Sequence, residues 1–251
     1  MHNVLGYAIQ VNEPMTNSGF DQYANDYETA LQQGLSVSGE SSDYFAVGRV
    51  RWLRKRLEAI RGNAPQLETA MDFGCGTGNS VEFLFSELKI QHVIGIDTSE
   101  QSLVQARVRY SSAQTEFITA EKYAPNSLLD LAYCNGVFHH IPVAMRESAV
   151  DFIYLSLKPG GWFAFWENNP WNPGTRLVMS RIPFDHDAIT LTIPESRRLI
   201  ERAGFTIKKI DTYFYFPNSL RWLRPIEPYL SWIPLGAQYL VLAQKDSPDS
   251  T

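Results

Sequence analysis

The stretch MDFGCGTG, residues 71–78, decides the fold of this chain. An apolar segment, LETAMDF (67–73), runs into three glycines that alternate with other residues, and a helical pattern, SVEFLFSEL (80–88), follows. Glycine adopts positive φ and lets a ligand approach the backbone closely. A strand, a glycine turn and a helix in this order predict the first unit of a ligand-binding α/β sheet.

The alternation of strands and helices continues along the chain. Further strands are predicted at 92–97, 116–120, 128–136, 162–167, 205–215 and 238–245, and further helices at 99–111, 142–157 and 194–204. Ser99 is the predicted N-cap of its helix, and KPGG (158–161) reads as a turn. This order predicts an α/β fold with a doubly wound, largely parallel, Rossmann-like sheet. Ligands bind such sheets beyond the carboxyl ends of the strands, where the strand order reverses.

Two amphipathic helices precede the sheet. They are predicted at 20–33 and at 43–61, the second with Asp43 as its N-cap. We therefore expect an N-terminal helical cap over residues 1–65, followed by the core over 66–251. Within that core, the long segment 168–193 is predicted to be an inserted lid.

Composition narrows the function classes. The 251 residues carry a net charge of −5 and no long basic block, which argues against a nucleic-acid partner. Two cysteines, no secretory signal and no apolar stretch of membrane-spanning length predict a cytoplasmic protein. The aromatic segment 213–239 has three interpretations: a covering layer on the core, an apolar substrate pocket, or a peripheral contact with lipid.

Three further features of the sequence narrow the kind of ligand that the glycine loop is expected to bind. Asp72 precedes the glycines, where a carboxylate would repel a pyrophosphate but attract a sulfonium or an ammonium group. Asp97 ends the next strand, nineteen residues past Gly78, and a carboxylate there can accept both ribose hydroxyls. The fourth strand ends in CNGVFHHIP (134–142), which offers mixed donors and apolar atoms.

The motifs MDFGCGTG, VIGIDTSEQSL, LDLAYCNGVFHHIP and LKPGGWF, in this order, resemble those of class I S-adenosylmethionine-dependent methyltransferases over residues 66–166. FDQYANDYE resembles the N-terminal cap of the small-molecule and quinone-biosynthesis branch. The resemblance implies a seven-stranded sheet with its last strand antiparallel. It also implies S-adenosylmethionine as cofactor, with S-adenosylhomocysteine as product, and methyl transfer to a small molecule.

The resemblance also assigns the cofactor contacts. Asp72 would lie near the methionine amino group, and Asp97 would bind the ribose. The other implied contacts are Gly74, Cys75 and Gly76 along the amino-acid half, Thr98 beside adenine, Asn135 and Gly136 at the methionine portion, and Tyr23 and Tyr27 closing over the cofactor. Relatives often carry an acidic residue just after the third strand. Here the sequence is TAEK (119–122), so the adenine contact falls to a backbone N–H near Ala120 or to Glu121.

Methyl transfer from a sulfonium is an in-line displacement, so positioning the acceptor can supply much of the acceleration. A general base is needed only where the acceptor loses a proton, and the candidates are His139, His140 and Glu167. Asn168, Trp171 and Arg176 are the candidate substrate contacts. No metal site is expected, because the adjacent Asp185, His186 and Asp187 cannot all face one ion.

The sequence leaves several alternatives open. A hydrophobic or aromatic acceptor is favoured by the C-terminal aromatic residues, whereas a protein or RNA methyltransferase would need an open, charged groove. A catalytically silent cofactor-binding module is the third possibility, and a nicotinamide dehydrogenase, opposed by Asp72, is the fourth. The chain is expected to be a monomer or a homodimer.

Overall fold

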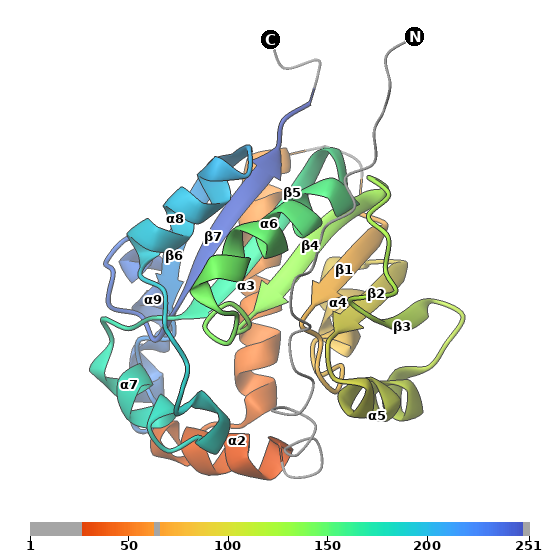
Figure 1. Cartoon of the computed structure of the whole chain (residues 1–251). Helices are drawn as coiled ribbons and strands as arrows, with labels where there is room; N and C mark the ends of the chain where they lie inside the picture. Colours follow the sequence, from red (N-terminus) through yellow and green to blue (C-terminus); the bar gives the residue numbers. More distant parts are fainter. Residues whose placement is uncertain (1–26, 63–65, 248–251) are drawn as a thin grey trace, which may run out of the picture.

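A seven-stranded sheet forms the centre of the molecule (Figure 1). The computed structural model describes residues 27–62 and 66–247. The strands are β1 (Thr69–Phe73), β2 (His92–Asp97), β3 (Thr115–Thr119), β4 (Leu129–Asn135), β5 (Leu157–Asn168), β6 (Phe205–Tyr213) and β7 (Gln238–Lys245). Their order is β3-β2-β1-β4-β5-β7-β6, and β7 alone runs in the direction opposite to the other six strands. The predicted fold class and the antiparallel last strand are confirmed.

Helices cover both faces of the sheet, with α6 and α8 on one face and α3 and α4 on the other (Figure 1). The helices are α2 (Tyr27–Leu35), α3 (Ser42–Arg61), α4 (Val81–Leu88), α5 (Glu100–Tyr110), α6 (Arg146–Ser156), α7 (Pro173–Met179), α8 (Ile193–Arg202) and α9 (Glu227–Leu230). Short 3₁₀ segments are η1 (Ser36–Ser38), η2 (Val143–Met145), η3 (Pro183–Asp185) and η4 (Asn218–Ile226). Among the described residues, no helix has both the length and the apolar character needed to cross a membrane.

Strand β5 divides its side chains between two apolar cores. Trp162 and Trp166 join the cluster under α3, α4 and α5, while Phe163 and Phe165 join the cluster under α6 and α8. Successive side chains of a strand point to opposite faces, which explains this division. A strand buried on both faces reads as a continuous apolar run, as WFAFW does.

Of the two N-cap residues predicted from the sequence, one is confirmed and the other is wrong. Ser99 caps α5 as predicted, because its hydroxyl accepts a hydrogen bond from the Ser102 N–H. The predicted cap Asp43 is wrong: Ser41 has extended backbone and accepts the bond from the Tyr44 N–H. Asp43 lies in the first turn of α3, where its negative charge complements the helix dipole.

The predicted turn KPGG (158–161) lies within β5 instead. Leu157 pairs with Leu129 at the start of the β4–β5 ladder, and a register shift separates this pair from Leu131 and Trp162. The irregularity accommodates the turn residues inside the strand, as β-bulges do.

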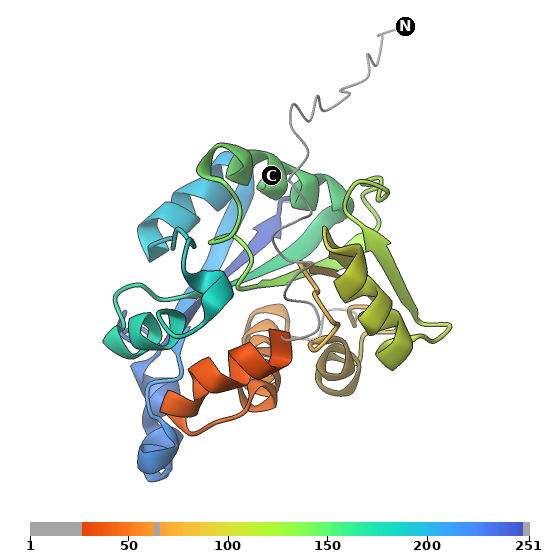
Figure 2. The same cartoon turned by 60° about the horizontal axis from the view of Figure 1, so that its bottom comes forward.

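Helix α2 lies at the carboxyl ends of the strands, beside α7 (Figure 2). A Cβ at Gly34 of α2 would stand 2.4 Å from Cγ1 of Ile182, so the backbone of α2 packs directly on the segment predicted to be a lid. The predicted helix 20–33 begins outside the described residues, and its described part ends at Leu35.

The aromatic segment 213–239 divides into two parts. Phe214 is buried, and its ring packs 5.0 Å from that of Phe45 in α3. By contrast Trp222, Tyr229 and Trp232 are 71%, 78% and 76% exposed. Phe214 at the start of the segment and Tyr239 at its end, which is fully buried, therefore contribute to the interior, whereas these three aromatic side chains between them do not.

A buried carboxylate ties α3 to the edge strand β6. Asp211 is 1% exposed and accepts hydrogen bonds from Trp52 Nε1 at 3.2 Å and from Arg56 Nε at 2.5 Å. Arg56 also donates through a second nitrogen at 3.2 Å, so the pair is bidentate. Such a pair costs much to break, because the remaining partner is left buried and uncompensated.

We expect Asp211→Ala to lower the free energy of unfolding by about 3 kcal/mol, because Arg56 and Trp52 lose their common acceptor. Urea denaturation followed by far-UV circular dichroism measures the change. Lys209→Ala is the control, since Lys209 lies 3.8 Å from Asp211 at the exposed rim, and we expect it to cost less than about 0.5 kcal/mol. Equal costs for the two variants would contradict this account of α3.

Candidate functional site

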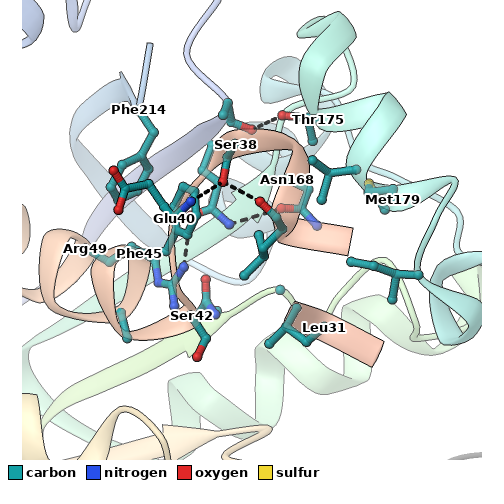
Figure 3. A pocket seen from close by; sticks show the side chains of 18 of the residues that line it. Leu31, Ser38, Glu40, Ser42, Phe45, Arg49, Asn168, Thr175, Met179 and Phe214 are labelled. Carbon is teal, nitrogen blue, oxygen red and sulfur yellow. Dashed lines mark hydrogen bonds between the residues drawn. The ribbon is translucent and has the colours of Figure 1, made fainter. Parts of the chain in front are cut away.

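A cavity of about 370 Å³ lies at the carboxyl edge of the sheet, where the ends of β1, β4 and β5 meet. The strand order reverses at β1 and β4, the position at which doubly wound sheets bind ligands. The cavity extends from this edge to α2, α3 and α7, and Figure 3 shows side chains from these elements facing it.

The glycine loop after β1 packs tightly against the loop after β4. Gly74 has φ +73°, and a Cβ there would stand 2.3 Å from Cγ2 of Val137. The N–H groups of Gly74 and Cys75 both donate to the Ile96 carbonyl, at 2.7 and 3.0 Å. Only glycine tolerates this conformation and this approach, so the loop shape follows from the sequence.

Asp97 holds the same loop from the end of β2. Its carboxylate accepts hydrogen bonds from the N–H groups of Gly76 at 2.8 Å and Ser99 at 2.9 Å. Among the described residues it does not line the cavity. Its shown contacts therefore fix the loop.

Two buried oxygens on the cavity wall have no hydrogen-bond partner within the described chain. They are Asp72 Oδ2 and Asn135 Oδ1, at the ends of β1 and β4. Burial and, secondarily, the charge of Asp97 raise the pKa of Asp72 to about 7, although Arg49 acts in the opposite direction. An unpaired buried acceptor is costly, so the pair is suited to a ligand that donates N–H bonds, such as an ammonium group.

Arg49 supplies positive charge at the same edge. Its Nε donates to the Tyr133 hydroxyl at 3.2 Å and its Nη1 to Gln238 Oε1 at 3.1 Å. It is the one lysine or arginine among the described residues that line the cavity. Sequence reasoning missed it, because a basic residue in an amphipathic helix normally faces solvent.

The far wall of the cavity is apolar. Its residues come from the N-terminal helices, from α7 and the segment after it, and from the chain after β6: Leu31, Leu35, Phe45, Val178, Met179, Ile182, Phe184, Phe214 and Phe216. The cavity therefore has one polar end at Asp72 and one apolar side. The first part of the C-terminal aromatic segment contributes to that apolar side.

A cluster of histidines and carboxylates is formed by the loop after β4, the end of β5 and η3. Glu167 is fully buried; its Oε1 accepts the Phe138 N–H at 2.7 Å, and its Oε2 lies 2.7 Å from His139 Nδ1. The Nε2 atoms of His139 and His140 lie 3.5 and 3.3 Å from Asp185 Oδ1. Burial opposes protonation of His139, but Glu167 and Asp185 outweigh it and raise its pKa to about 10. Burial lowers the pKa of His140.

This cluster joins residues that are far apart in sequence. His139, His140 and Glu167 were predicted as candidate catalytic residues, and the structure brings them together. Asp185 was not predicted to join them. It lies about 45 residues after His140, and nothing in a single sequence indicates that contact. His186 and Asp187 are exposed, so the three adjacent residues do not converge.

The predicted site residues fall into two groups, those that line the cavity and those that do not. Those that line the cavity are Asp72, Gly74, Cys75, Gly76, Asn135, Gly136, His139, His140 and Asn168. Among the described residues, those that do not line it are Asp97, Thr98, Ala120, Glu121, Glu167, Trp171 and Arg176. Tyr23 lies outside the described residues, as does the side chain of Tyr27, although Tyr27 begins α2.

The raised pKa of Asp72 makes stability depend on pH. Its pKa of about 7 exceeds the unfolded value of about 3.9, so the folded chain binds the extra proton between these values. The contribution of Asp72 to stability is therefore lost as pH rises from about 4 through about 7. We expect Asp72→Asn to stabilise the ligand-free protein by about 2 kcal/mol more at pH 8 than at pH 5.

Urea unfolding at the two pH values measures this difference. Asp151→Asn, on the exposed surface of α6, is the control and should show no such dependence. An Asp72→Asn effect that does not change with pH would mean that Asp72 is ionised throughout.

Comparisons with known proteins point in one direction. A family profile described as "Methyltransferase domain" matches residues 71–163. The chain is 33% identical over 116 residues to trans-aconitate 2-methyltransferase of Variovorax paradoxus, a match that covers 45% of this chain and 44% of that protein. It is 26% identical over 195 residues to the protein of the same name from Sinorhizobium fredii, covering 69% and 74%. The match thus spans less than half the length of the first relative.

A solved S-adenosylmethionine-dependent methyltransferase from Archaeoglobus fulgidus has the same fold. It superposes with a TM-score of 0.59 at 18% identity, covering 82% of this chain and 95% of that one. At this identity the likeness concerns the fold alone.

Proposed function

We propose that this chain, as a class I methyltransferase with S-adenosylmethionine as its cofactor, methylates a small molecule held in the cavity. One observation carries this proposal. The buried oxygens Asp72 Oδ2 and Asn135 Oδ1 lack partners among the described residues and lie beside the glycine loop. The amino group of the methionine portion has the charge and the donors that they lack.

The residues of the glycine loop fit the amino-acid half of the cofactor. Gly74, Cys75 and Gly76 line the cavity, and Asp97 fixes the position of Gly76. Asp97, at the end of β2 beside this loop, is the proposed ribose contact. Gly136 is a further proposed contact of the methionine portion. Thr98, Ala120 and Glu121 are the proposed contacts of adenine, and Tyr23 and Tyr27 are proposed to close over the cofactor.

When bound, the cofactor supplies a methyl carbon made electrophilic by the adjoining sulfonium. The chain's part is to hold an acceptor atom in line with that carbon and to exclude water. Where the acceptor must lose a proton, the candidate to receive it is His140, because burial lowers its pKa and Asp185 holds its ring. His139 already holds a proton beside Glu167, so its proposed role is to orient the acceptor.

We propose that the acceptor is largely apolar, with one polar group directed toward the histidines. Relatives act on trans-aconitate, which carries three carboxylates. Here the described cavity lining has Arg49 as its one Lys or Arg side chain, against Glu40, Asp72 and Asp185. Glu40 is paired with Arg224 at 2.7 Å. The apolar wall supports a hydrophobic or aromatic body better than a tricarboxylate.

Cofactor binding is the first test. In calorimetric titration we expect micromolar, one-to-one binding of S-adenosylmethionine and S-adenosylhomocysteine, and no binding of NAD. Asp72→Asn should weaken both affinities by about a hundredfold, because a buried charge-assisted hydrogen bond is lost.

Asp151→Asn serves as the control, as it changes the same side chain on an exposed helix face. Absence of adenosyl binding would overturn the proposed function. Binding without turnover of any acceptor would instead indicate a silent cofactor-binding module.

The apolar wall is tested at α7. Val178 lines the cavity, whereas the adjacent Leu177 is exposed and does not. We expect Val178→Asp to raise KM for an apolar acceptor at least tenfold with little change in cofactor affinity, because an acceptor must then desolvate a charge.

Leu177→Asp is the matched control and should leave both quantities unchanged. The acceptor is first found by mass spectrometry on a panel that includes phenols, apolar carboxylates and trans-aconitate. Sole activity on trans-aconitate, unaffected by Val178→Asp, would refute an apolar acceptor site.

A further inference from the structure

Three ligand atoms of metal-binding types converge on the cavity wall. They are Nε2 of His139, Nε2 of His140 and Oδ1 of Asp185, and the cluster's ligand atoms lie within 4.8 Å of one another. The histidines follow β4 and the carboxylate comes from η3, so two distant segments meet at this point. All three residues line the cavity.

The distances within this group are those of ligands sharing an ion. Both histidine nitrogens stand 3.3–3.5 Å from Asp185 Oδ1. N–H···O hydrogen bonds normally measure about 2.7–3.2 Å. Two ligands each about 2.1 Å from a tetrahedral ion lie about 3.4 Å apart. The spacing thus matches two edges of a coordination polyhedron.

Glu167 has the position of the outer carboxylate found behind metal-bound histidines. Its Oε2 lies 2.7 Å from His139 Nδ1, on the side of the ring away from Asp185. A histidine that donates its Nδ1 proton to a carboxylate presents the Nε2 lone pair to a metal in a fixed orientation. The Phe138 N–H in turn fixes Glu167.

Charge balance supports the same conclusion. The side chains of Glu167 and Asp185 are 0% and 4% exposed, and buried carboxylates require compensation. An ion bound to Nε2 of His139 displaces the proton that Glu167 and Asp185 otherwise hold on this histidine, and a dication in its place balances both carboxylates. Arg146, which contacts Ile141 and Ile189 carbonyls at the edge of this region, is not bonded to either carboxylate.

We propose that His139, His140 and Asp185 bind one divalent transition-metal ion, with the remaining coordination positions open to the cavity. Two imidazoles and one carboxylate suit Zn²⁺, Co²⁺, Ni²⁺ or Fe²⁺ better than Mg²⁺ or Ca²⁺, which prefer oxygen ligands. The sequence-based expectation of no metal site rested on the adjacent residues 185–187 and on finding no other ligand cluster with them. The long-range contact of Asp185 with the two histidines is the reason to propose one.

The ion's use rests on the proposed function. An acceptor oxygen would bind at an open position of the ion. Gly136, at which a Cβ would stand 3.6 Å from Cε1 of His139, adds no side chain beside that ring. Coordination also lowers the pKa of a bound hydroxyl, so the acceptor would reach its nucleophilic form at neutral pH.

The site is tested by titrating the full chain, stripped with a chelator, with Co²⁺ at pH 7.5. Visible absorption reports coordination, and Zn²⁺ competition reports affinity. We expect one Co²⁺ per chain with micromolar Kd. Asp185→Asn and His140→Gln should each weaken binding at least tenfold.

Asp187→Asn is the matched control, because Asp187 lies two residues from Asp185 and its side chain is exposed. It should bind Co²⁺ as the wild type does. Thermal unfolding of each variant confirms that it is folded. No stoichiometric Co²⁺ binding by the wild type, or equal binding by Asp185→Asn and Asp187→Asn, would overturn the metal site.

Calorimetry with S-adenosylhomocysteine on the same samples separates the two proposals. Metal binding without adenosyl binding would leave the metal site standing and defeat the proposed function. Binding of S-adenosylhomocysteine without stoichiometric binding of Co²⁺ would overturn the metal site and leave the proposed function standing.

Discussion

The close approach of two loops is the constraint on which the site depends. Gly74 has no Cβ, and this lets the backbone after β1 meet Val137 in the loop after β4. The approach places Asp72 and Asn135 on one cavity wall. It also sets the position of the two histidines, which follow Val137 after one intervening residue, Phe138. A larger residue at Gly74 would push the two loops apart and would change the positions of Asp72, Asn135 and the histidines relative to one another.

Buried carboxylates in this fold follow two different energetic regimes. Asp211 is satisfied by Arg56 and Trp52, so it stabilises the attachment of α3. Asp72 has an unpaired oxygen, so its charge opposes folding until a cation arrives. Unpaired buried charges of the kind seen at Asp72 are typical of binding sites. They lower the free energy of unfolding of the ligand-free protein. A ligand that supplies the missing charge recovers that free energy on binding.

Sequence patterns predicted what is local and failed where the structure is long-range. The bounds of β2 and β7 and the cap Ser99 were all predicted correctly, because apolar periodicity and capping chemistry act over a few residues. Asp43 was a near miss, since Ser41 offers the same chemistry two positions earlier. Arg49 and Asp185 could not be placed, because their partners Tyr133 and His140 are set by packing between distant elements. The glycine loop could be recognised in the sequence because positive φ and close backbone approach require glycine at particular positions.

The position of β7 between β5 and β6 has a consequence for biosynthesis. β6 pairs with β7 alone, so β5 and β6 stay unjoined until the ribosome has released residues 238–245. Through that interval the nascent chain exposes unpaired strand edges, which are prone to aggregate. Gln238 opens β7 and bonds both Arg49 and Asn168 at the cavity. Completion of the sheet and completion of this wall are therefore one late event in the maturation of the chain.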